Sequence, residues 1–137
     1  MEKVTVKRSI AVLVIVTEKF KEELQVELRE AAETTQQRID QMEFRSRRVL
    51  ADLQRADLTQ AMTARRQFEG EKRRQEAIRQ ELLEELEEAG KLELGSEYPR
   101  GTVESVVELS EGDDLLEKLT GCQIVVKDGV VLEIRNP

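Results

Sequence analysis

Apolar residues recur at helical spacing along most of this chain. Residues 18–89 contain no proline and a single glycine, Gly70. Thr17 precedes them, and threonine is one of the residue types that cap helix N-termini. Further on, apolar and small residues follow one another at steps of four and three, which is the heptad spacing of a helix that packs against another helix. These positions are Thr35, Ile39, Met42, Ser46, Val49, Leu53 and Ala56.

The heptad phase slips after Ala56, where Asp57 and Gln60 match the capping-box pattern of a helix start. We therefore predict that the chain reverses at residues 55–59. A continuous helix would be about 110 Å long at about 1.5 Å per residue, so strands at its two ends could meet only in different molecules. Two helices folded as an antiparallel hairpin would instead bring those strands into one sheet. A continuous rod with sheets shared between molecules is the alternative.

An N-terminal strand is expected over residues 4–17. It begins with alternating apolar and polar residues and passes into a run of seven apolar residues at positions 10–16, which is typical of a strand that becomes buried on both faces. Crossing a bilayer needs about 20 apolar residues. No small-residue cleavage site of a signal peptide follows the run. We expect a buried strand and no membrane association.

A connector with a turn at residues 99–101 is expected after the helical stretch, since proline and glycine favour turns. Alternation over residues 102–109 predicts a strand. Asp113 or Asp114 is expected to cap a short helix over residues 115–119.

The clearest local signal is Asp128-Gly129, which lies between two β-type runs. This residue pair suits a type I′ hairpin, in which both turn positions need positive φ. Together the elements predict an α+β protein. A small β-module is formed by residues 1–17 and 92–137, and a long, coiled-coil-like antiparallel helical hairpin of residues 18–91 projects from it. The sequence leaves open whether the module closes into a barrel.

The composition fits this architecture, because 37% of the 137 residues are charged and only 3% are aromatic. The net charge of -7 is unevenly distributed: residues 38–79 carry 11 basic and 7 acidic side chains, whereas residues 80–137 carry 5 and 15. The basic side chains expected near the far end of the hairpin could contact phosphates or an acidic protein surface, or could simply keep long helices soluble. These candidate interaction residues are Arg45, Arg47, Arg48, Arg55, Arg65, Arg66, Lys72, Arg73 and Arg74.

No set of residues in the chain predicts catalysis, a cofactor or a metal site. Histidine is absent, and Cys122 is the single cysteine, with no histidine to activate it. The acidic cluster at residues 84–88 would spread around an exposed helix face. Residues 112–114 lack the other ligands of a calcium loop. We predict a protein that is not an enzyme, and the lone cysteine fits a reducing, cytoplasmic location.

Three segments resemble the YlqD family of small bacterial and cyanobacterial proteins of unknown function. They are VKRSIAVLVIVTEKFK at residues 6–21, LELGSE at residues 92–97 and IVVKDGVVLEIR at residues 124–135. Because they come from both ends of the chain and the helical stretch links them, the resemblance covers nearly its full length. It implies no reaction and supplies no catalytic residue.

The sequence favours a non-enzymatic scaffold or adaptor whose helical arm pairs with itself in an oligomer, first of all a dimer, or with another protein. Four apolar residues fall outside the main heptad positions and could form a second interface: Val26, Phe44, Leu50 and Leu83. The alternative is an RNA- or ribosome-associated factor whose basic hairpin end contacts the phosphate backbone.

Overall fold

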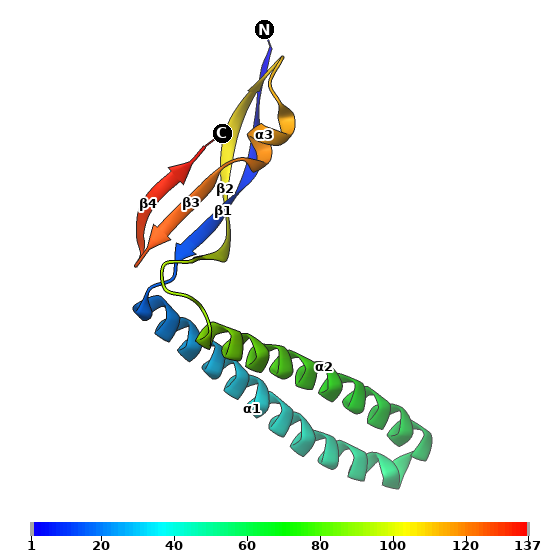
Figure 1. Cartoon of the computed structure of the whole chain (residues 1–137). Helices are drawn as coiled ribbons and strands as arrows, with labels where there is room; N and C mark the ends of the chain where they lie inside the picture. The colour runs from blue at the N-terminus through cyan, green and yellow to red at the C-terminus, as the bar shows by residue number, and fades with distance from the viewer. Residues whose placement is uncertain (1, 137) are drawn as a thin grey trace. The chain divides into compact units, whose positions relative to one another are not determined.

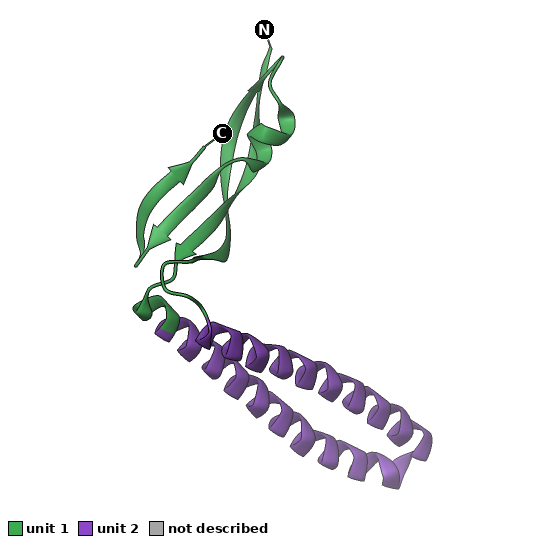
Figure 2. Ribbon diagram, viewed as in Figure 1, with its two compact units in different colours: residues 1–21, 92–137 green, residues 22–91 purple. Residues whose placement is uncertain are grey.

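The computed structural model describes residues 2–136. The chain divides into two compact units (Figures 1 and 2). Unit 1 contains residues 1–21 and 92–137, and unit 2 contains residues 22–91.

Unit 1 is built on a four-stranded sheet with the strand order β2-β1-β3-β4 (Figure 1). The central strand β1, Lys3–Ile15, pairs antiparallel with β2, Glu97–Ser110, and parallel with β3, Gln123–Lys127. Strand β4, Val130–Arg135, pairs antiparallel with β3. The backbones of β2 and β4 do not pair with each other, so the described strands form an open sheet rather than a closed barrel.

The register aligns apolar side chains across all four strands of this sheet. Val14 is opposite Tyr98 on β2 and Val126 on β3, and Val126 is in turn opposite Val131 on β4. The small helix α3, Leu115–Thr120, lies beside β1 and β2. The most buried side chains of unit 1 have these exposed fractions: Val16 1%, Val125 1%, Cys122 5% and Ile10 7%.

The prediction of a turn at residues 99–101 is wrong. Strand β2 already begins at Glu97, and Pro99 is opposite Leu13 of β1. The register shifts here, because Arg100 and Gly101 lie between the residues that pair with Leu13 and Ala11. Gly101 has a φ of 95°, and Pro99 is tolerated because β2 is an edge strand. The residues that suggested a turn therefore form a β-bulge inside a longer strand.

The two local predictions near the C-terminus are confirmed. Asp114 caps α3 by accepting a hydrogen bond from the Glu117 backbone N–H at 3.0 Å. The turn between β3 and β4 has positive φ at both positions, 47° at Asp128 and 82° at Gly129. This is the conformation that a type I′ hairpin requires.

Unit 2 is a pair of long antiparallel helices (Figure 2). Helix α1 spans Glu18–Ala56 and helix α2 spans Leu58–Gly90. The first residues of α1 belong to unit 1, where the Thr17 hydroxyl caps the helix by accepting from the Phe20 N–H at 3.1 Å. The buried residues of α1 all lie in its first 22 positions: Leu24, Leu28, Ala32, Thr35 and Ile39.

The reversal between the helices takes a single residue, Asp57, whose backbone is extended at φ -156° and ψ 107°. Its N–H still donates to the Leu53 carbonyl at 2.7 Å, and so completes α1. Its carboxylate accepts from the N–H groups of Thr59 and Gln60 at 3.0 and 3.3 Å, and so caps α2. The chain is therefore a hairpin and not a continuous rod, and the α+β fold is confirmed.

Replacing Asp57 tests this cap. We expect Asp57→Ala to lower the free energy of unfolding by about 1 kcal/mol, because the first N–H groups of α2 lose their acceptor. Urea unfolding followed by circular dichroism at 222 nm measures the change. Asp57→Asn, which keeps a side-chain oxygen at the same place, should retain most of the stability. Equal losses in both variants would show that the carboxylate charge, and not the cap, is responsible.

Candidate functional site

The nine candidate cations lie on the halves of α1 and α2 that flank Asp57. Four are on α1 and five on α2. Eight are exposed, and only Lys72 is partly covered. The hairpin thus gathers them in one part of unit 2, although they do not converge on a single point.

Lys72 joins the two helices. Its ammonium is 2.6 Å from the Glu43 carboxylate of α1 and 3.8 Å from Glu76 of its own helix. The hydrogen bond from Lys72, followed by its positive charge, lowers the pKa of Glu43 below the ordinary 4.5. The same hydrogen bond and the charge of Glu43 raise the pKa of Lys72. Lys72 is therefore a cross-helix contact more than a free binding group.

Arg74 is also engaged, since it forms a salt bridge with Glu71 one turn earlier on α2. Within residues 2–136, the remaining seven candidates form no salt bridge. Four of them lie on α1 and three on α2: Arg45, Arg47, Arg48, Arg55, Arg65, Arg66 and Arg73.

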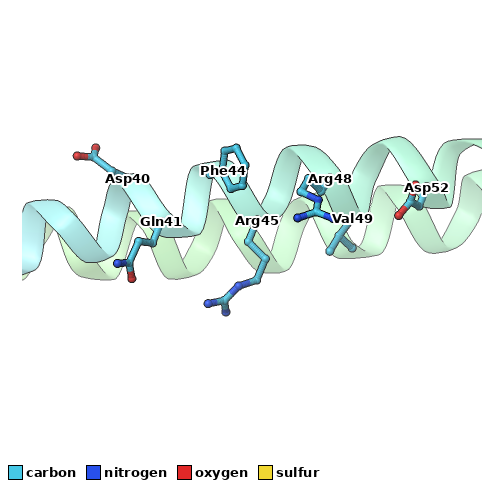
Figure 3. A pocket seen from close by; sticks show the side chains of 7 residues that line it. All are labelled: Asp40, Gln41, Phe44, Arg45, Arg48, Val49 and Asp52. Atoms are coloured by element: carbon cyan, nitrogen blue, oxygen red, sulfur yellow. The ribbon is translucent and has the colours of Figure 1, made fainter.

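An open surface pocket of about 670 Å³ lies on α1 alone, as Figure 3 shows. Phe44 is 62% exposed and lies between Asp40 and Arg48 along the helix. The lining residues are Asp40, Gln41, Phe44, Arg45, Arg48, Val49 and Asp52. The heptad spacing places Phe44 outside the main packing positions of α1, but it does not predict the charged residues around Phe44.

A smaller gap of about 190 Å³ lies between the two helices. It is lined by Met42, Ser46 and Leu50 of α1 together with Phe68 and other residues of α2. Leu50 therefore faces the space between the helices and does not lie off the packing positions as predicted. Of the other three off-position residues, Val26 and Phe44 are exposed and Leu83 is half-buried.

Two acidic residues and the cysteine that the sequence analysis weighed as catalytic or metal-binding candidates have structural roles. Asp113 accepts from the Ser110 N–H at 2.8 Å, Asp114 caps α3, and Cys122 is buried. The glutamates of the cluster at residues 84–88 are exposed on α2. Over the described part of the chain, no group of three or more His, Cys, Asp or Glu side chains is placed to hold a metal ion.

One interaction of unit 1 was not predicted from the sequence. The Arg135 guanidinium of β4 binds the Glu97 carboxylate of β2, with Nη1 donating to Oε2 at 3.1 Å. Since β2 and β4 are the two edges of the sheet, this pair bridges edge strands whose backbones are not bonded to each other. The hydrogen bonds that Arg135 donates to Glu97 lower the pKa of Glu97. The hydrogen bonds to Glu97 and to Glu133 raise the pKa of Arg135.

Known proteins match this chain over nearly its full length. The family model described as YlqD protein matches residues 4–135. The chain belongs to the YlqD family. The uncharacterized YlqD protein of Bacillus subtilis (strain 168) is 29% identical over 130 residues, which cover 93% of this chain and 94% of the relative.

A solved structure has the same fold. The crystal structure of a protein of unknown function from Synechococcus sp. WH 8102 is 28% identical and superposes with a TM-score of 0.92, covering 98% of this chain and 96% of that one. The descriptions of these two proteins name no substrate or partner. In the part of the chain that the structure describes, no helix is long and apolar enough to cross a membrane.

The Glu43–Lys72 contact predicts a pH dependence. The folded pKa of Glu43 is depressed, so its contribution to stability is present above the unfolded value of 4.5 and is lost as the pH falls through the folded pKa. We expect Glu43→Gln to lower the melting temperature at neutral pH, and the gap from wild type to close in acid. Thermal unfolding over a pH series measures this.

Glu81→Gln is the matched control, because Glu81 is exposed on α2 and forms no salt bridge within the described residues. It should melt with wild type throughout the series. A gap for Glu43→Gln that stays constant into acid would contradict the assignment to the Lys72 contact.

Proposed function

We propose that this YlqD-family protein is a non-enzymatic, cytoplasmic scaffold or adaptor that acts through protein–protein contacts of its helical hairpin, including self-association. The single observation that carries the proposal is how little of the second half of α1 is buried. None of residues 40–56 of α1 is buried, whereas five residues between positions 24 and 39 are. On α2, Ala61 near the reversal and Ala89 at the other end are buried. The second half of α1 therefore leaves surface open to a partner.

Phe44 gives this open half an anchor. Its ring is 62% exposed in the middle of a charged helix surface, and it lines the larger pocket. Aromatic residues are enriched at protein interfaces, where a few well-packed side chains carry most of the binding energy. An aromatic ring held out by a long helix is therefore placed to insert into, or stack against, another protein.

Strand β4 offers a second surface, on unit 1. It is an edge strand, and four of its six residues are apolar and 55–70% exposed: Val130, Val131, Leu132 and Ile134. Edge strands present unpaired backbone groups that can bind another strand. Two separate surfaces of this kind support an adaptor more than a single-site binding protein.

The alternative of RNA binding has less support. Seven of the nine candidate cations form no salt bridge within residues 2–136, but residues 22–91 as a whole carry 13 basic and 17 acidic side chains. Lys72 and Arg74, two of the nine candidate cations, are already engaged by glutamates. Non-specific nucleic-acid binding depends on a concentrated positive surface, and single-strand binding adds stacking aromatics.

Self-association is tested by light scattering coupled to size-exclusion chromatography over a concentration series. We expect a mass that approaches twice the 15.7 kDa of the chain as concentration rises. Phe44→Ser should shift the transition to higher concentration, because the apolar anchor is lost. Ile78→Ser is the matched control, since Ile78 is also exposed, at 45%, but lies on α2. A mass of one chain at all concentrations would exclude self-association.

A further inference from the structure

The surface of α1 around Phe44 lies opposite the surface that packs on α2. At about 100° per residue, the packing positions Thr35 and Leu53 fall about 180° around the helix from Phe44. The residues of α1 that lie within about 40° of Phe44 around the helix axis are all exposed. Over residues 32–56 they are Glu33, Gln37, Asp40, Arg48, Ala51 and Arg55. Formation of the hairpin therefore leaves this surface, which we call the Phe44 face, available to a partner.

The charges on the Phe44 face are arranged symmetrically about Phe44. Asp40 lies four residues before it and Arg48 four residues after it. Glu33 lies eleven residues before it and Arg55 eleven after it. One half of the face is therefore acidic and the other half basic, at equal distances from the aromatic ring.

Asp40 and Arg48 lie too far apart to pair with each other within one helix, as do Glu33 and Arg55, although Arg48 and Arg55 have Asp52 within one turn and Glu33 has Arg29. Asp40 and Arg48 are about 12 Å apart at about 1.5 Å per residue, and Glu33 and Arg55 are farther apart still. Within residues 2–136, none of the four forms a salt bridge. Asp40 does accept a hydrogen bond from Gln36 Nε2 at 3.0 Å, which leaves its charge unneutralised.

We infer that the Phe44 face binds the same face of a second copy of this chain, antiparallel, about a two-fold axis at Phe44. In that arrangement Asp40 meets Arg48 of the other copy, Glu33 meets Arg55, and each of these contacts occurs twice. A two-fold interface requires this reciprocity, in which residue i contacts j and j contacts i. A parallel pairing would instead set Asp40 against Asp40.

The parts of this interface have different roles. Exposed ion pairs contribute little affinity, but like charges placed opposite each other are strongly unfavourable, so the four charges set orientation and register. The two Phe44 rings meet at the axis and supply the apolar contact. Residues 32–56 of each α1 would overlap, a length of about 37 Å.

Charge reversal at the paired positions tests the inference, which rests on the self-association proposed above. Asp40→Arg and Arg48→Asp should each raise the dissociation constant of the dimer by about tenfold or more, because each places like charges opposite one another twice. An equimolar mixture of the two variants should form a heterodimer of near wild-type affinity, since the introduced arginine then faces the introduced aspartate. Sedimentation equilibrium at low salt measures all three.

Matched controls lie outside the Phe44 face. Glu81→Arg on α2 and Arg38→Asp on α1, about 120° around the helix from Phe44, make the same changes of charge at exposed positions and should associate as wild type does. Circular dichroism should show unchanged helicity in every variant. The tandem variant Asp40→Arg/Arg48→Asp restores complementarity within one chain and should dimerise, so a folding defect in a single variant would not be mistaken for the expected loss.

The outcomes separate the two claims. A wild-type protein that remains a monomer overturns self-association and, with it, this interface. A wild-type dimer that neither single reversal weakens leaves self-association in place and overturns the Phe44 face as its interface. Single variants that dissociate but do not combine in the mixture overturn the antiparallel pairing.

Discussion

The pairing of Val16 with the segment around Ser96 constrains the rest of the chain. The Val16 N–H donates to the Ser96 carbonyl and the Gly95 N–H donates to the Val16 carbonyl, both at 2.8 Å. Strands β1 and β2 pair from Ile15 and Glu97 onward. The residues in between must therefore leave the sheet and return to it. Helices of 39 and 33 residues, reversed at Asp57, satisfy this requirement with backbone hydrogen bonds almost throughout.

The fold was predictable wherever local chemistry determines it. Asp128-Gly129 specified the C-terminal hairpin, and Asp57 specified the reversal, because positive φ and helix capping depend on a few neighbouring residues. The bulge at Gly101 was taken for a turn because proline and glycine favour both. Only the pairing of β2 with β1 distinguishes them, and that register is set between residues far apart in the sequence.

The candidate site was predictable only in part, for the same reason. The sequence identified the basic residues and the apolar Phe44, but Lys72 meets Glu43 only once the hairpin register is known. Leu50 was placed outside the packing positions of α1, because the heptad spacing selects the neighbouring Val49, and only the position of α2 shows that Leu50 faces the space between the helices. The symmetry of charge about Phe44 is visible in the sequence, but it has meaning only when the structure shows that this face points away from α2.

Inter-chain distances between spin labels test the antiparallel pairing of two copies through the Phe44 face. Thr34 and Gln54 are exposed, lie ten residues on either side of Phe44 and can carry labels as cysteines in a Cys122→Ala background. With antiparallel pairing, chains labelled at 34 mixed with chains labelled at 54 should give a short distance, and either chain paired with itself should give about 30 Å along the helix axis. Short distances between identical sites, with the long distance in the mixture, would contradict it.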